Sequence, residues 1–320
     1  ACTGDEGMRN CRTTQELVAG ALGLEASDIL PASTGVIGAQ LKMDLWEKAA
    51  PALAANLGKA TPEDFARAIM TTDAFHKISH REVSLPGGVV KLVGMAKGAG
   101  MICPNMATML SVVLCDAQVE ASVWQKMLRD AVELTFNRVT VDGDTSTNDT
   151  LYGLANGASG VSASDEESLK ALSAALTSVL GDLAYMLVKD GEGASKVARI
   201  HVTGAASDAD AERVARTVGH SQLVKTALYG RDANWGRIVA AVGRSGADFN
   251  PDDVVVTLCG VELFRKGQPT DLDFDALLEE PLKQRDLPID IVLGSGSGSY
   301  TLLASDLGHE YVNVNADYRS

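Results

Sequence analysis

Short runs of β-branched and apolar residues alternate with segments of helical period along this chain, and that alternation restricts its fold more than any other feature. Apolar runs at 83–85, 89–93 and 106–115 are separated by glycine and proline, as is typical of strands in a buried sheet. Helical period follows at 123–136, and a longer amphipathic stretch reaches from 164 to about 189. The pattern predicts an α/β protein with helices outside its sheets.

The pattern restarts at about Val197, which indicates a second α/β unit. We find no internal repeat that would indicate a solenoid or propeller. The sequence therefore predicts a domain at 1–196 and a smaller α/β domain at 197–320. In the second unit we expect strands at 197–202, 254–259, 289–293 and 300–304, and helices at 209–218, 221–229, 235–242 and 274–282.

The first 70 residues carry helix signals. Thr13 and Glu16 form a capping box that predicts a helix at 13–22, and a second helix is expected from Asp44. Thr61 before proline and two acids predicts a third, running to about Met70. The chain opens without methionine in a Cys-Thr-Gly-Asp-Glu-Gly stretch that we interpret as a turn, and we expect that a further segment preceded it.

Composition excludes several classes of protein. A formal net charge of −14 opposes binding to a phosphate backbone, so no nucleic-acid partner is expected. Five scattered cysteines, none in a CxxC pair, indicate neither a disulfide framework nor a zinc site. Apolar runs such as 110–115 are too short to span a bilayer, and no basic and apolar leader opens the chain. We expect a cytoplasmic protein with no membrane partner.

The segment 97–110 joins a glycine-rich loop to an apolar strand, with Thr108 at the junction. A threonine hydroxyl needs an adjacent base to act as a nucleophile, and a newly freed α-amino group on the same residue supplies one. Attack on the carbonyl of Ala107 would cut the Ala107–Thr108 bond, and a small residue within a flexible loop permits the strained geometry. From the residues alone, the better interpretation of Thr108 is an ordinary β-branched strand residue.

Motifs along the whole chain match those of one family in order. Lys97 and the glycine loop lead into Pro-Asn-Met-Ala-Thr-Met-Leu at 104–110. Five more stretches agree: Ser-Thr-Gly-Val-Ile-Gly at 33–38, Val-Asp-Gly-Asp-Thr-Ser-Thr-Asn-Asp at 141–149, Lys-Asp-Gly-Glu-Gly-Ala at 189–194, Gly-Arg-Asp-Ala-Asn-Trp-Gly-Arg-Ile at 230–238 and Tyr-Val-Asn-Val-Asn-Ala-Asp-Tyr at 311–318. The chain resembles the ArgJ-type ornithine acetyltransferases of arginine biosynthesis, also called glutamate N-acetyltransferases.

This resemblance implies a fold and a maturation step. The fold is the self-processing αββα sandwich shared with the DmpA-like enzymes, followed by the smaller α/β domain. Cleavage would give an α chain, 1–107, and a β chain, 108–320, which assemble as an α2β2 heterotetramer in most relatives. The family carries a further N-terminal segment of strands before the position of Ala1.

The resemblance also implies a reaction. Thr108 would take acetyl from N2-acetyl-L-ornithine and pass it to L-glutamate by a ping-pong mechanism. No cofactor is implied, although some relatives also accept acetyl-CoA as donor and so act as N-acetylglutamate synthases. The alternatives are an N-terminal-nucleophile aminopeptidase or amidohydrolase of the related fold, a catalytically silent protein, and a nucleotide-binding enzyme.

Site residues follow from the same resemblance. Thr34 and Gly35 match the oxyanion pair, with the hydroxyl and the backbone N–H as donors, although Ser-Thr-Gly is also an ordinary turn. The rest of the resemblance assigns substrate binding to Thr72 (or its neighbour Thr71), Lys97, Thr108, Glu192, Asn315 and Ser320. Lys97 is suited to a substrate carboxylate, and Glu192 to an ammonium group or a departing amine.

Two loops resemble, in part of their sequence, a calcium-binding loop and a phosphate-binding loop. The Asp-rich stretch at 142–148 has Thr147 where a calcium loop needs glycine and Gly153 where it needs glutamate, so we interpret it as a hydrogen-bonded turn without a metal. The Gly-Ser run at 294–299 is followed by a strand pattern and carries no GK[ST], so we expect a flexible hairpin, not a phosphate-binding loop.

Overall fold

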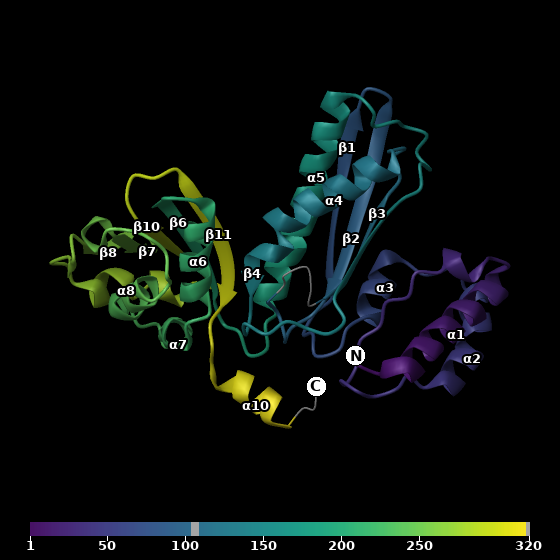
Figure 1. Ribbon diagram of the computed structural model, residues 1–320, viewed down its shortest axis with the longest axis horizontal. Coiled ribbons are helices and arrows are strands. Elements are labelled where there is room, and N and C mark those ends of the chain that lie inside the picture. The colour runs from purple at the N-terminus through teal and green to yellow at the C-terminus, as the bar shows by residue number, and fades with distance from the viewer. Residues whose placement is uncertain (104–108, 318–320) are drawn as a thin grey trace.

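Two β-sheets with surrounding helices form the body of the molecule (Figure 1). This computed structural model describes residues 1–103 and 109–317. A four-stranded sheet lies between a helical N-terminal segment and a seven-stranded sheet (Figure 1). The predicted α/β class is therefore confirmed.

The four-stranded sheet has the order β1-β2-β3-β5. Its first three strands are antiparallel, and β5 pairs with β3 in parallel. The antiparallel register places Lys97 opposite Leu110, so the end of β2 lies beside the start of β3, where the predicted site begins. The strands are β1 (Lys77–Leu85), β2 (Gly88–Lys97), β3 (Leu110–Cys115) and β5 (Thr150–Ala155).

Two helices cover one face of this sheet, α4 (Ala121–Leu134) and α5 (Glu166–Lys189). The contact is close at Gly94, where a Cβ atom would lie 2.6 Å from Val179, so the sheet needs glycine there. Among the described residues α5 is long and apolar enough to cross a membrane, contrary to the expectation that every apolar stretch is too short. Leu176 and Leu183 are fully buried against the sheet, as in a core helix of a globular protein.

The seven-stranded sheet has the order β4-β11-β6-β10-β7-β8-β9. Strand β6, third in this order, pairs in parallel with β10 and antiparallel with β11. Helix α6 packs on β6 and β11. The strands are β4 (Val139–Thr140), β6 (Val197–Ala205), β7 (Val255–Leu258), β8 (Val261–Arg265), β9 (Gln268–Pro269), β10 (Asp286–Val292) and β11 (Gly298–Ser305).

The remaining helices lie around the sheets. In the N-terminal segment, α1 and α2 pack against each other, whereas α3 contacts β1 and β2. They are α1 (Gly4–Leu22), α2 (Met43–Ala55), α3 (Pro62–Ala68), α6 (Asp208–Gly219), α7 (Gln222–Tyr229), α8 (Trp235–Gly243), α9 (Phe274–Leu278) and α10 (His309–Asp317), with 3-10 turns at Ala26–Asp28, Phe136–Arg138, Pro251–Asp253 and Pro281–Lys283.

Each sheet has its own apolar core. Leu172, Leu180 and their neighbours on α5 form the first core with the four-stranded sheet. The second core lies between α6 and the seven-stranded sheet and includes Ala198. Strand β4 comes from the first half of the chain yet pairs with β11, which ties the two parts together. The division into domains at 196 and 197 stays a prediction.

The N-terminal helix corrects one prediction. The stretch that we interpreted as a turn at 2–7 belongs largely to α1, which begins at Gly4. Thr13 therefore lies inside the helix and caps nothing. In contrast, the predicted helix start at Thr61 is confirmed. The structure adds a capping box there, in which Thr61 Oγ1 accepts from the Asp64 N–H at 3.2 Å and Asp64 Oδ2 accepts from the Thr61 N–H at 2.8 Å.

The Gly-Ser run at 294–299 is not a hairpin, because β6 lies between β10 and β11. The run instead crosses the end of β6, and its glycines allow two backbones to approach. A Cβ atom at Gly296 would lie 2.0 Å from the Ala205 carbonyl oxygen, and one at Gly204 would lie 2.2 Å from that of Gly294. The regular glycine spacing is thus explained by backbone packing.

Candidate functional site

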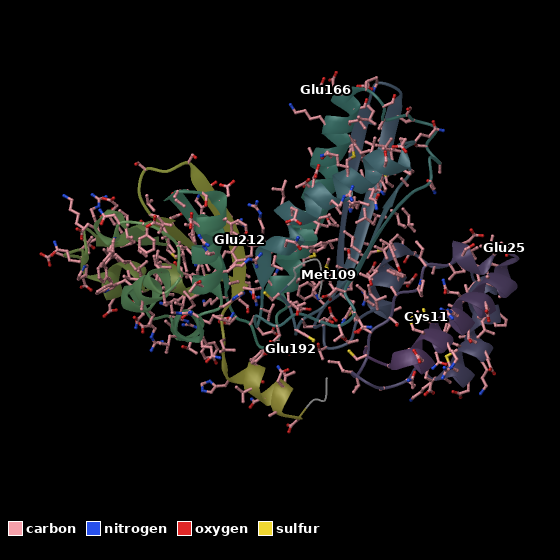
Figure 2. All side chains as sticks on the ribbon, viewed as in Figure 1. Cys11, Glu25, Met109, Glu166, Glu192 and Glu212 are labelled. Carbon is pink, nitrogen blue, oxygen red and sulfur yellow. The ribbon has the colours of Figure 1, made fainter. Side chains whose placement is uncertain are left out.

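One cavity of about 210 Å³ gathers the predicted site residues that the structure describes. It lies where the loop after β2, the start of β3, the 142–149 turn, the loop after α5 and helix α10 meet. Figure 2 labels Met109 and Glu192, which both line it. The predicted residues in its wall are Thr34, Gly35, Thr72, Lys97, Glu192 and Asn315.

Three predicted residues lie outside the described part of the chain. They are Ala107 and Thr108, on either side of the expected cleavage bond, and Ser320 at the C-terminus. Met109, which is bonded to Thr108 in the sequence, is buried and lines the cavity.

Lys97 ends β2 and extends into this cavity. Its Nζ donates to Thr71 Oγ1 at 2.8 Å, so of the two neighbouring threonines Thr71 holds the lysine while both line the cavity. Burial lowers the pKa of Lys97, and the nearby Asp73 and Glu192 carboxylates partly offset this effect. A partly buried cation that binds no carboxylate among the described residues is suited to an incoming carboxylate.

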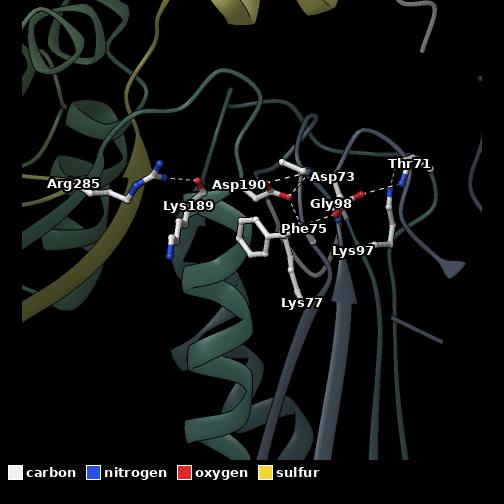
Figure 3. Close-up of polar contacts among 10 residues, drawn as sticks. Thr71, Asp73, Phe75, Lys77, Lys97, Gly98, Lys189, Asp190 and Arg285 are labelled. Carbon is white, nitrogen blue, oxygen red and sulfur yellow. Dashed lines mark hydrogen bonds and ion pairs between the residues drawn. The ribbon is translucent and has the colours of Figure 1, made fainter. Parts of the chain in front are cut away.

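A buried ion-pair network lies beneath Lys97 (Figure 3). Lys77 Nζ lies 2.6 Å from Asp73 Oδ1 and 2.5 Å from Asp190 Oδ2, and the Lys77 side chain is fully buried. Asp73 also accepts from the N–H groups of Gly98 at 2.6 Å and Thr71 at 3.0 Å. The network thereby fixes the backbone on both sides of the Lys97 ammonium.

The two carboxylates of this network differ in pKa. For Asp73, burial acts to raise the pKa, but Lys77 and the N–H donors of Gly98 and Thr71 together hold it below its usual value. For Asp190, burial prevails over Lys77 and raises the pKa. Asp73 accepts from two backbone N–H groups and Asp190 from one, that of Ala74, and the charge of Asp73 further raises the pKa of Asp190.

Asp142 holds the glycine loop in place. Its carboxylate accepts from the N–H groups of Met101 at 2.6 Å and Ile102 at 2.9 Å. Tyr311 Oη on α10 lies 3.4 Å from the same carboxylate. Asp142 is thus committed to backbone donors, as expected of a hydrogen-bonded turn. Within residues 1–103 and 109–317, no three His, Cys, Asp or Glu side chains gather as a metal site would need.

Glu192 closes the cavity from the loop after α5. Its N–H donates to the Ala99 carbonyl at 2.9 Å, and its Oε2 accepts from Asn315 Nδ2 at 2.8 Å. A Cβ atom at Gly100 would lie 2.5 Å from Oε2, so glycine at 100 leaves room for the carboxylate. The sequence motifs at 97–101 and 189–194 therefore meet in space.

Thr34 and Gly35 lie in an exposed segment at the cavity wall. Two hydrogen bonds hold the segment just before them. Asn148 Nδ2 donates to the Ser33 carbonyl at 2.9 Å, and Tyr152 Oη donates to the Pro31 carbonyl at 2.7 Å. A hydroxyl and a backbone N–H presented at one wall can serve as oxyanion donors.

Asp149 was not predicted as a site residue, although it lies within one of the matched motifs. It lines this cavity and also a larger one, of about 1300 Å³, between α4 and β5. Of the predicted site residues within the described ranges, none lines the larger cavity. The burial of Asp149 depends on the pairing of β3 with β5, and no local pattern in the sequence indicated that pairing.

Comparison with known proteins agrees with the motifs gathered here. The family model described as ArgJ family matches residues 1–320. The chain belongs to the ArgJ family. A protein named "Arginine biosynthesis bifunctional protein ArgJ" from Nitratidesulfovibrio vulgaris is 72% identical over 320 residues, which span all of this chain and 81% of the relative. A protein of the same name from Geobacter sulfurreducens is 46% identical, over all of this chain and 82% of the relative.

A solved structure supports the same assignment. The crystal structure of an ArgJ protein from Bacillus halodurans matches with a TM-score of 0.59 and 34% sequence identity, covering 63% of this chain and 96% of the other. The chain therefore has the fold class that the motifs implied, the αββα sandwich type.

Proposed function

We propose that this chain transfers acetyl from N2-acetyl-L-ornithine to L-glutamate through an acetyl ester on Thr108. It is an acyltransferase of arginine biosynthesis, as its family membership and its 72% identical relative imply. The observation that carries the proposal is the gathering of Thr34, Gly35, Thr72, Lys97, Glu192 and Asn315 around one cavity, beside the residue bonded to Thr108.

The reaction takes two steps that share one nucleophile. In the first, the Thr108 hydroxyl oxygen attacks the acetyl carbonyl, the amide C–N bond breaks, and the hydroxyl proton passes to the departing ornithine amine. In the second, the glutamate nitrogen attacks the acetyl ester, the C–O bond breaks, and a proton returns to Thr108. The α-amino group released by cleavage of the Ala107–Thr108 bond acts as the base.

The cavity residues take distinct roles in this proposal. Thr34 and Gly35 donate to the oxyanion that forms in both steps. Lys97 binds the substrate α-carboxylate, which donor and acceptor both possess. Glu192 binds an ammonium group of the ornithine moiety, and Asn315 orients Glu192 through the hydrogen bond at 2.8 Å. Thr72 and Ser320 complete the substrate contacts.

Further parts of the proposal rest on the resemblance alone. The chain would need no cofactor, would accept acetyl-CoA as a second donor in a bifunctional enzyme, and would assemble as α2β2 in the cytoplasm. Its relatives are named bifunctional, which supports the acetyl-CoA reaction.

Mass spectrometry with a labelled donor tests the transfer. Incubation with N-acetylornithine that carries a deuterated acetyl group should add one labelled acetyl to the fragment that begins at Thr108, and glutamate should then remove it as labelled N-acetylglutamate. Release of labelled acetate with glutamate left unmodified would favour the amidohydrolase alternative instead.

A further inference from the structure

Asp149 carries a buried carboxylate that accepts no hydrogen bond of standard geometry from the described residues. Neither oxygen is accessible to solvent, although the backbone N–H groups of Met109 and Ser146 stabilise its charged form. Buried carboxylates normally accept well-formed hydrogen bonds, so one without them calls for an explanation, and a catalytic role is one such explanation. Asp149 immediately precedes β5, and the next residue, Thr150, donates its N–H to the Met109 carbonyl at 2.8 Å. The carboxylate is therefore fixed beside the start of β3.

The groups around Asp149 come from four segments. Lys97 on β2 is the charged group that acts on it, and the N–H groups of Met109, just before β3, and of Ser146, in the 142–149 turn, lower its pKa as hydrogen-bond donors. Arg129 on α4 lines the larger cavity on its other side. Burial outweighs the three nearer groups and raises the pKa of Asp149 to about 7. A base is most effective when its pKa is close to the working pH.

We propose that Asp149 is a further catalytic residue, which accepts the proton that the acceptor's ammonium group must lose before its nitrogen can attack the acetyl ester. The inference rests on the proposed function and deepens it, because it assigns a proton acceptor to the second step. Asp149 and Lys97 line the same cavity, so a glutamate whose α-carboxylate lies at Lys97 presents its α-ammonium group within that space.

Acetyl transfer to glutamate removes two protons from its nitrogen. The ammonium nitrogen of glutamate carries three protons, and the amide nitrogen of the product carries one. One proton passes to the Asp149 carboxylate, a new C–N bond forms as the C–O bond to Thr108 breaks, and the second proton passes to the Thr108 oxygen. Once the product has left, water that enters the cavity lined by Asp149 accepts this proton.

This assignment predicts a pH profile for acetyl transfer to glutamate. With Asp149 as base, kcat/KM for glutamate rises as Asp149 loses its proton and levels off above about pH 7. Without such a base only free amine reacts, so the rate keeps rising with pH toward the pKa of the glutamate amine. Hydroxylamine is largely uncharged at neutral pH, so it needs no such proton acceptor.

The test compares wild type with Asp149→Asn and with Asp130→Asn, which removes an exposed carboxylate on α4 outside both cavities. Acetyl-donor concentration is saturating, and kcat/KM is measured for glutamate and for hydroxylamine. We expect D149N to lower the glutamate value by about 100-fold or more, to change the hydroxylamine value by less than about threefold, and to lose the levelling near neutral pH. D130N should match wild type.

An equal loss with both acceptors, or no loss with either, would overturn the assignment and leave Asp149 a structural residue. If D149N fails to fold or mature, D149E should retain transfer to glutamate. The pH profile of the wild-type enzyme with glutamate also tests the proposal without any variant, because a profile that rises without levelling refutes it. Failure of the proposed function gives a different result, namely a wild-type enzyme that acetylates neither glutamate nor hydroxylamine.

Discussion

The side-chain amide of Asn315 donates to the Glu192 carboxylate across 2.8 Å, which joins the C-terminal helix α10 to the loop after α5. The two backbones also approach closely, since a Cβ atom at Gly193 would lie 2.6 Å from the Tyr311 nitrogen. Gly193 has a φ of 69°, which favours glycine independently. Residues near the end of the chain thus complete a cavity whose other walls come from its first 200 residues.

Asn315→Ala should therefore impair substrate binding more than folding. A hydrogen bond to a carboxylate at an exposed position contributes about 1 kcal/mol, so we expect kcat/KM for N-acetylornithine to fall roughly fivefold to tenfold. Steady-state kinetics at both substrates provide the measurement. Asn313→Ala on the same helix is the matched control, because its amide bonds only Glu310 at 3.2 Å. Equal effects of the two substitutions would contradict a specific role for Asn315.

The buried network at Lys77 predicts a large effect on stability. Lys77→Met would leave Asp73 and Asp190 unpaired in the core, which costs about 3–5 kcal/mol when one partner of a buried pair is removed. Denaturant unfolding of the purified protein measures this loss. Lys126→Met, which removes an exposed pair with Asp130, should leave the midpoint nearly unchanged. A midpoint for K77M equal to that of K126M would refute the structural role.

Lys225 predicts a dependence of stability on pH. Burial lowers its pKa from 10.5 to about 8, although Asp306 and Asp142 oppose this, and its Nζ lies 3.2 Å from Ser305 Oγ. Between these two pKa values the unfolded chain binds more protons than the folded one, so stability rises with pH across that window. The difference corresponds to about 3 kcal/mol.

Lys225→Met removes that titration. From pH 8 to pH 10, the free energy of unfolding of wild type should increase by about 2 kcal/mol relative to the variant. Urea unfolding at both pH values, with K126M as the exposed control, gives the comparison. A difference between wild type and K225M that stays constant over this range would show that Lys225 does not titrate as described.

Local signals in the sequence were sufficient to predict an element whose boundaries depend only on its own residues. The end of α5 at Lys189 and the cap of α3 at Thr61 follow from helix period and capping chemistry. Strand β5 was missed, because Gly153 interrupts its pattern; the glycine is required since a Cβ atom there would lie 2.3 Å from Leu128 on α4. Helix α10 was also missed, because none of its described residues is buried.

The same distinction between local sequence signals and contacts from distant elements holds for the site. Motif resemblance brought together residues as distant as Thr34 and Asn315, which no periodicity could have paired. Lys77 and Asp149 were not identified, because their importance depends on burial and on neighbours from other strands. The Gly-Ser run at 294–299 was interpreted as a hairpin because sequence adjacency does not reveal that β6 separates β10 from β11.

The proposed mechanism requires that the chain cut its own Ala107–Thr108 bond to create its nucleophile. Intact mass and N-terminal sequencing of freshly expressed protein, beside a Thr108→Ala variant, measure this cleavage. Wild type should give two fragments, the second beginning at Thr108, and the variant should give one uncut chain. A single uncut chain in both, or the same two fragments in both, would contradict this mechanism.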